Sequence, residues 1–197
     1  RGEKSPVRFA ACVKVMKRTG DFSPRVKEVI DEAGLSNQAF YRHFTSKEEL
    51  LLAVIDAGTR DLDVYLRRRM GAVEEPVSKI RAWVSGFTAQ AISPEAAAAT
   101  RPFMIPSARL ADRFPDAVRA NKEQLTAALV EALNNAVKAG AVRDDVDAVE
   151  DARFIYDLCK EWLQRQLTAS ELPAPAEARK SARRLETFVV AAIGGKK

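Results

Sequence analysis

Residues 35–44, Leu-Ser-Asn-Gln-Ala-Phe-Tyr-Arg-His-Phe, combine polar and aromatic side chains in a way that suits contact with DNA. The segment contains no acidic side chain, and its hydroxyl, amide, guanidinium and imidazole groups can donate hydrogen bonds to phosphates and base edges. Leu35, Phe40 and Phe44 can instead face a core. The segment therefore predicts a short helix with one apolar face and one face that lies on DNA.

Signals at the start of this segment place it in a helix-turn-helix. Gly34 can end the preceding helix with a positive φ. Ser36 can cap the following helix by accepting hydrogen bonds from the free amides of its first turn. The second helix of such a pair lies in the major groove while its neighbours hold phosphates. Asn37 and Gln38 suit base edges, because amides pair well with adenine, and Ser36 can serve either base or phosphate. The phosphate candidates are Tyr41, Arg42, His43 and Lys47.

The competing interpretation is that these side chains form only the solvated face of a short helix. Residue types alone do not decide between the two interpretations. Helix signals surround the segment. Helices are predicted over 5–20 and 24–34, each beginning at Ser-Pro. Ser46 can then bond the amide of Glu49, whose carboxylate can reach back, and this capping box begins a long fourth helix that runs towards Met70.

Beyond Gly71 the composition shifts towards alanine and other apolar residues. Helices are predicted over 76–91, over 94–111 with a break near Pro102 and Pro106, and over 116–139 with Gly140 at the end. Two further helices with broad apolar stripes follow, separated by a proline-rich linker over 172–175. The predicted fold class is all-α, with a three-helix DNA-binding domain over 1–50 and a second helical domain over 51–197. The helix that begins at residue 46 joins the two.

Composition excludes several other classes of protein. A chain of 197 residues with a net charge of +5 can bury a sizeable core and favours an anionic partner. His43 is the single histidine, so histidine metal clusters are excluded and a serine-histidine triad would have to lie inside the DNA-binding segment. There is no Gly-x-Ser-x-Gly elbow, phosphate-binding glycine loop or Cys-x-x-Cys pair. We therefore expect no enzyme, no cofactor and no metal.

The two cysteines, Cys12 and Cys159, stand among apolar residues at helical spacing, as small buried thiols do. No apolar run approaches the roughly 18 residues that suggest a membrane span. Together these features lead us to expect a cytoplasmic protein that does not associate with membranes.

Three motifs in order, Glu32-Ala33-Gly34-Leu35-Ser36, then Phe40-Tyr41-Arg42-His43-Phe44, then Ser46-Lys47-Glu48-Glu49-Leu50, resemble the tetracycline-repressor (TetR) family of bacterial regulators. The resemblance covers roughly residues 9 to 57. It implies a three-helix DNA-binding domain, a variable helical ligand domain and a homodimer. By position it implies that Asn37 and Gln38 read bases and that Tyr41, His43 and Lys47 hold phosphates. Where the family has a hydroxyl-bearing pair this chain has Pro24-Arg25, so that phosphate contact falls to Ser23 or Arg25.

The resemblance also implies a pocket for a small effector in the second domain. Large apolar side chains are available to line it, although any one of them can equally be core. The candidates are Trp83, Phe87, Phe103, Met104, Phe114 and Phe154. Polar selectors could be Gln90, Arg101 or Tyr156. We expect the ligand to be largely apolar.

The last two helices can either form a homodimer bundle or close the core of a monomer. A dimer is favoured, because a two-fold axis spaces two recognition helices by about 34 to 36 Å, one turn of DNA, or a multiple of it. The dimerisation candidates are Ile155, Leu158, Trp162, Leu185, Phe188 and Val189. The family resemblance thus implies a repressor released from a palindromic operator by a small ligand. The alternative is a helical protein-interaction or ligand-binding module with only non-specific affinity for DNA.

Overall fold

The computed structural model describes residues 14, 15, 18, 25–34, 36, 38, 41, 42, 44–104, 107–169 and 171–194. Every regular element within these ranges is helical, which confirms the predicted all-α class. The elements are α2 (Val26–Ala33), α4 (Lys47–Gly71), α5 (Pro76–Thr88), the 3-10 helix η1 (Ala89–Ala91), α6 (Pro94–Met104), α7 (Ser107–Arg113), α8 (Pro115–Lys138), α9 (Ala148–Thr168) and α10 (Pro175–Ala192). The helix expected over 5–20 falls largely outside the described residues.

The ends of the helices follow from local chemistry. Gly34 ends α2 with a φ of 63°, and its N–H donates to the carbonyl of Asp31 at 3.2 Å. Gly140 likewise has a φ of 63° just after α8. Ser46 caps α4 by accepting from the Glu49 amide at 3.1 Å. The Glu49 carboxylate reaches back to the backbone N–H of Thr45 at 2.7 Å, one residue before the cap.

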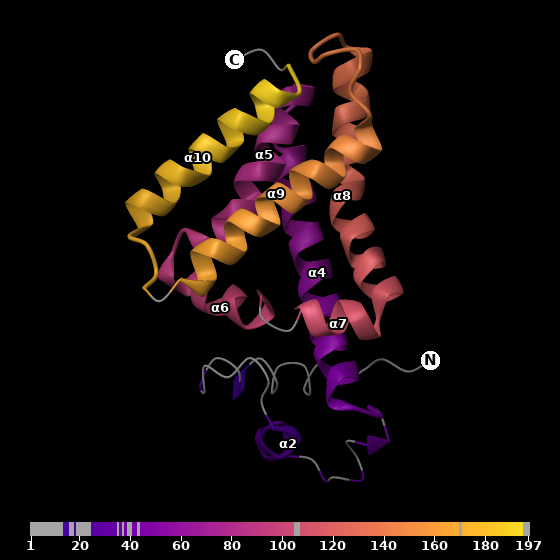
Figure 1. Ribbon diagram of the computed structural model, residues 1–197, viewed down its shortest axis with the longest axis vertical. Helices are drawn as coiled ribbons and strands as arrows, with labels where there is room; N and C mark the ends of the chain where they lie inside the picture. The colour runs from indigo at the N-terminus through magenta and orange to yellow at the C-terminus, as the bar shows by residue number, and fades with distance from the viewer. Residues whose placement is uncertain are drawn as a thin grey trace.

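Of the two prolines expected to break the helix over 94–111, Pro102 does not end it. Pro102 lies inside α6, which continues to Met104, and α7 begins at Ser107. Pro106 lies outside the described residues. The short α7 lies near the lower ends of α4 and α8 (Figure 1).

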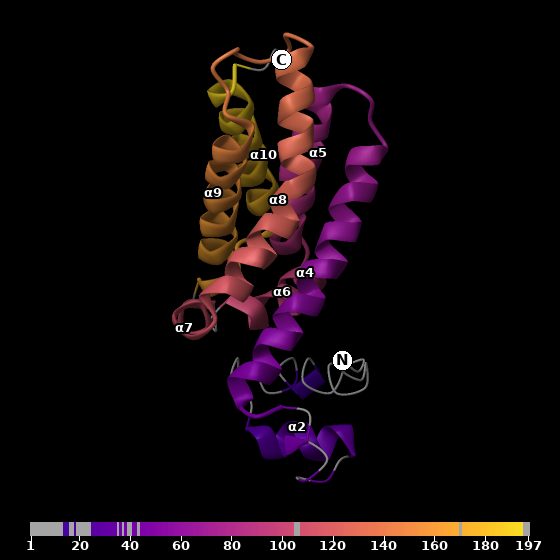
Figure 2. The same cartoon turned by 90° about the vertical axis from the view of Figure 1, so that its right-hand side faces the viewer.

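The long helix α4 joins two parts of the molecule. Its lower end meets the described residues 25–46, which we call the head, and its upper part packs in the body with α5 and α8 (Figures 1 and 2). The body core is built from apolar side chains of α4, α5, α8, α9 and α10, with Trp83, Leu129 and Leu163 almost fully buried. A smaller core holds the head together. Its members are Val29, Ile30, Phe44, Leu50, Leu51, Val54 and Leu110.

Contact between α4 and α5 is closest at Gly86. A Cβ at this position would lie 2.8 Å from Cδ2 of Leu66 and 3.0 Å from Cδ of Arg69. Glycine therefore lets the backbone of α5 approach α4 more nearly than any other residue allows. None of the helices within the described ranges is both long enough and apolar enough to cross a bilayer.

Candidate DNA interface and effector cavity

The head presents a helix, a glycine turn and the start of a second helix. In α2, Val29 and Ile30 are buried in the smaller core, while the backbone N–H of Arg25 donates to the Glu28 carboxylate at 3.0 Å and closes the first turn. After the turn at Gly34, the amide of Arg42 donates to the carbonyl of Gln38 at 3.1 Å. This i to i−4 bond is helical. The described part of the segment thus has the expected helix-turn-helix form.

One face of this second helix turns outward and the other inward. Ser36, Gln38 and Arg42 are exposed, and Tyr41 keeps 56% of its surface accessible. Phe44 is buried, as its predicted core position requires. The described polar side chains of this helix are thus accessible on the face that the sequence predicts to contact DNA.

The other predicted DNA contacts are only partly described. Arg25 is exposed at the start of α2, and Lys47 is half-buried at the start of α4. Ser23, Asn37 and His43 lie outside the described residues. On the same head, Glu32 is held by Lys14 at 2.6 Å, and the hydrogen bond from Lys14 lowers the pKa of Glu32. The nearby acid is thus paired with a cation of the chain itself.

A cavity of about 460 Å³ lies in the body. Its size falls within the range of small-molecule sites. Side chains from α4, α5, η1, α6, α7, α8 and α9 line it. Its lining is formed by Ile55, Gly58, Thr59, Asp61, Leu62, Tyr65, Phe87, Gln90, Ala99, Thr100, Met104, Leu110, Val118, Asn121, Leu125, Tyr156, Lys160 and Leu163.

The residues expected to line a pocket divide between the cavity and other places. Phe87 and Met104 lie on its wall. Trp83 lies behind Phe87, stacked on it at 5.1 Å, and its Nε1 donates to the Leu125 carbonyl at 3.1 Å. Trp83 is therefore core. Phe114 packs against the smaller core of the head, because it precedes α8 at the base of the body.

Phe154 does not line the cavity either, since it keeps 60% of its surface in solvent on the outer face of α9. The side chain of Phe103 is outside the described structure. Among the suggested polar selectors, Gln90 and Tyr156 do lie on the wall, and Arg101 does not. Sequence reasoning missed Lys160, although its position four residues after Tyr156 on one helix was a usable signal.

Tyr156 is a partly buried polar group of the wall. Its ring meets Phe87 edge-on at 5.7 Å, and the Nζ of Lys122 lies 5.4 Å from the ring centroid. Burial, aided by the charge of Asp157, raises the pKa of Tyr156 to about 12. Its hydroxyl is consequently protonated and able to donate at neutral pH. Asp157 itself is held by Lys122 at 2.6 Å.

The cavity and the core of the head share a wall. Leu110 of α7 lines the cavity and is also a buried member of the smaller core. Ile55 and Val118 line the cavity and pack against that same core. Just beyond, Arg113 forms an ion pair of 3.4 Å with Glu48 at the start of α4. A single layer of side chains therefore separates the cavity from the smaller core of the head.

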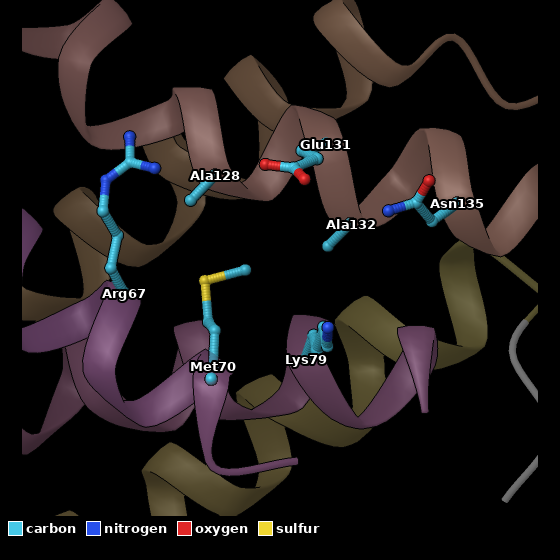
Figure 3. A pocket seen from close by; sticks show the side chains of 8 residues that line it. Arg67, Met70, Lys79, Ala128, Glu131, Ala132 and Asn135 are labelled. Atoms are coloured by element: carbon cyan, nitrogen blue, oxygen red, sulfur yellow. The ribbon is translucent and has the colours of Figure 1, made fainter. Parts of the chain in front are cut away.

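A second, smaller hollow lies at the other end of the body, between the end of α4, the start of α5 and α8 (Figure 3). It measures about 170 Å³. In Figure 3, Met70 points from α4 towards Ala128 and Ala132 of α8, and Glu131 and Asn135 stand on the α8 side. It is open and contains no residue that the sequence singled out.

The predicted dimerisation residues lie at two depths on α9 and α10. Phe188 is 62% exposed and Leu158 is half-buried, whereas the rest of the set is buried within the chain's own core. Those buried members are Ile155, Trp162, Leu185 and Val189. Trp162 also donates from Nε1 to the hydroxyl of Ser181 at 2.9 Å, which ties α9 to α10. Cys159 is fully buried, as expected, and burial raises its pKa to about 12.

Comparison with known proteins agrees with the geometry of the head. The family model "Bacterial regulatory proteins, tetR family" matches residues 22–54, which span α2, the turn and the start of α4. Over these residues the chain is similar to the TetR family of bacterial regulatory proteins. Within the described residues, no cluster of three or more metal-ligating side chains occurs.

Relatives resemble this chain over different lengths. HTH-type transcriptional activator FasR of Mycolicibacterium smegmatis is 30% identical over 87 residues, which span 44% of this chain and 40% of that protein. A TetR-family regulator of Pectobacterium atrosepticum superposes with a TM-score of 0.77 at 19% identity, covering 96% of this chain and 94% of the other. FadR of Bacillus subtilis, in complex with stearoyl-CoA, superposes with a TM-score of 0.74 at 15% identity, covering 95% and 98%. These two superpositions establish the shared fold.

Proposed function

We propose that this protein is a TetR-family regulator, a homodimeric repressor that leaves a palindromic operator when a small, largely apolar effector fills the body cavity. The observation that carries this proposal is the shared wall, because Leu110 and Val118 belong at once to the cavity and to the packing of the head. A ligand can release DNA only by preferring the conformer that does not bind it. Because the cavity and the core of the head share this wall, a ligand in the cavity can favour the conformer that does not bind DNA.

The outward face of the second head helix is the DNA-reading surface of this proposal. Gln38, with Asn37, reads base edges, and Ser36 contacts either base or phosphate. Tyr41 and Lys47 hold phosphates, together with His43 and Arg42. Ser23 or Arg25 supplies the contact at the start of α2. The exposure of Ser36, Gln38, Tyr41 and Arg42 supports these roles.

The outer face of α9 and α10 is the dimer interface of this proposal. Phe154 and Phe188 keep 60% and 62% of their surfaces in solvent, and interface centres are rich in such aromatic side chains. The buried residues beneath them hold the two helices together. Phe188→Glu should convert the dimer to a monomer in sedimentation equilibrium, with Arg183→Glu on α10 as a control that stays dimeric. Equal assembly of the Phe188 variant and the native chain would refute this interface.

The effector part of the proposal rests on the cavity. Phe87, Met104, Leu125 and Leu163 make much of its wall apolar, and FadR of Bacillus subtilis, which shares the fold, holds stearoyl-CoA. An acyl chain suits such a wall. Filling the cavity would press on Leu110 of α7, and α7 is tied to the start of α4 by Arg113 and Glu48. Movement of α4 would then change the spacing of the two recognition helices.

Selection of bound duplexes from a random library at physiological salt tests the proposed function. The winner is then titrated against its scrambled form. A palindrome bound about 10³-fold or more tightly than the scrambled duplex supports a dimeric, sequence-specific regulator. Weak, salt-sensitive binding with no enriched sequence would instead favour a helical module with non-specific affinity. Because FasR carries the name of an activator, a reporter behind the selected operator decides the sign, and repression predicts higher expression when the regulator is removed.

A further inference from the structure

The cavity wall is not uniformly apolar. The hydroxyls of Thr59 and Thr100 line it, and its one positively charged side chain within the described residues, Lys160, stands on α9 four residues from Tyr156. Two of its amide side chains have partners within the chain, since Gln90 donates to the Phe87 carbonyl at 2.9 Å and Asn121 donates to Asp56 at 2.8 Å. On α9, by contrast, the hydroxyl of Tyr156 and the amine of Lys160 have no hydrogen-bond or ion-pair partner within the described residues. These two groups are the available donors of that helix.

Tyr156 and Lys160 are arranged to act together. They stand four residues apart on α9, so their side chains share one face of the helix, and both line the cavity. In the neighbouring acid, Asp157, both carboxylate oxygens accept hydrogen bonds from Lys122, at 2.8 and 2.6 Å. It therefore satisfies Lys122 on α8 rather than Lys160.

Their chemistry selects one kind of ligand group. Tyr156 and Lys160 are partly buried and line the cavity, so a ligand there can supply the acceptor that they lack within the described residues. Lysine contributes a positive charge and the phenol contributes a neutral O–H, a combination that suits an oxyanion. The one carboxylate that lines the cavity, Asp61, belongs to α4. An anionic group would thus be placed on the α9 side, and an uncharged tail would extend along the apolar wall.

We propose that the effector is an acidic amphiphile whose carboxylate or phosphate is bound by Tyr156 and Lys160 while its apolar part fills the remaining cavity. This inference rests on the proposed function, since it identifies the class of effector for the same cavity. It adds a charged anchor to a site that the sequence presents as merely apolar.

Displacement of the neutral fluorophore N-phenyl-1-naphthylamine from the full-length protein tests the inference. The competitors share one chain length and differ in the head group: 1-decanol, decanoate, decyl phosphate and decanoyl-CoA. The variants are Lys160→Met, Tyr156→Phe and, as a matched control, Lys180→Met, which removes an exposed cation of α10 far from the cavity wall. Decanoate and decyl phosphate distinguish a carboxylate from a phosphate, and decanoyl-CoA shows whether a phosphate-bearing carrier is accepted.

The inference predicts that at least one acidic probe displaces the fluorophore at about tenfold lower concentration than decanol, because a hydrogen bond to a charged group is worth about that factor. Lys160→Met should abolish this preference and leave decanol unaffected. Tyr156→Phe should reduce the preference, and Lys180→Met should behave as the native chain.

Equal displacement by decanol and every acidic probe overturns the inference, as does a preference that survives in Lys160→Met or no displacement by any acidic probe. Operator binding separates this failure from that of the proposed function. If decanol alone weakens operator binding, the regulator is effector-released and the anionic anchor is wrong. If Lys160-dependent acid binding leaves the operator affinity unchanged, the anchor holds and the release mechanism fails.

Discussion

The head and the body of this protein use side chains in opposite ways. In the head, Gln38, Tyr41 and Arg42 stand in solvent and the few buried residues only fix their direction. In the body, the candidate binding residues such as Phe87 belong to the core itself and border a hollow within it. A surface site can change its residues without loss of folding, whereas a cavity site shares its residues with stability. The comparison predicts that mutations will separate binding from stability in the head and will couple them in the body.

The largest effect should come from removing a body aromatic. Trp83 has no exposed surface, and its indole N–H is bonded to Leu125. Trp83→Ala should lower the free energy of unfolding by about 3 to 5 kcal/mol, measured by urea denaturation. Tyr41→Ala, which removes an exposed aromatic of the head, should stay within about 0.5 kcal/mol of the native chain. Similar losses in both variants would remove the distinction between the two regions.

For DNA binding, variants of the head should have the larger effect. Gln38→Ala should cost about 1 to 3 kcal/mol of discrimination between the selected operator and a single-base variant, because an amide that reads a base edge is lost. Tyr41→Ala should weaken the operator and a scrambled duplex by the same factor, because phosphate contacts carry no sequence information. Fluorescence anisotropy titrations measure both. Parallel losses on both duplexes for Gln38→Ala would deny it a base-reading role.

The contact between α4 and α5 gives a prediction that joins the two regions. The Cβ of Gly86→Ala would press against the side chains of Leu66 and Arg69, and because Leu66 is buried, we expect a loss of about 1 to 3 kcal/mol in the free energy of unfolding. Gly71→Ala is the control, because a Cβ there meets nothing within 4 Å. It should be neutral or stabilising by up to about 1 kcal/mol. If α4 transmits the state of the body, Gly86→Ala should also change operator affinity while Gly71→Ala does not.

The smallest effect concerns the ion pair between Arg113 and Glu48. Both side chains are substantially exposed, so a double-mutant cycle with Glu48→Gln and Arg113→Gln should give a coupling of about 0.2 to 1 kcal/mol at neutral pH. The backbone N–H at the helix start, followed by Arg113, lowers the pKa of Glu48 below its ordinary value of 4.5. A lowered folded-state pKa stabilises the fold above the ordinary value, and that contribution is lost as the pH falls through the lowered one. Coupling that persists in strong acid would contradict this assignment.

Helix ends were predicted from the sequence more completely than the cavity, for a physical reason. Caps and turns are local, so Gly34, Ser46 and Gly140 could be read from their neighbours, and each ends or begins a helix as expected. The polar face of residues 35–44 was equally local. A cavity depends on how distant helices meet. Trp83 and Phe87 stand one turn apart on α5, yet one is core and the other lines the hollow.

Lys160 shows the same limit from the polar side. Its position relative to Tyr156 was visible, but nothing local indicated that this face of α9 borders an open space rather than solvent. Likewise, apolar stripes identified α9 and α10 without showing which members lie beneath the surface. Ile155 and Val189 are buried within the chain, and Phe188 is not. Helical periodicity identifies the apolar face of a helix, whereas the packing of other helices determines which of its residues are buried.

The most direct test of the account is the affinity for the selected operator with the cavity empty and with it saturated by the tightest displacing probe. Two sites that share the wall at Leu110 should be thermodynamically coupled, and we expect operator binding to weaken by about tenfold or more when the cavity is filled. By reciprocity, operator DNA should weaken probe binding by the same factor. Operator affinity that is identical with empty and filled cavity would contradict the claim that the body controls the head.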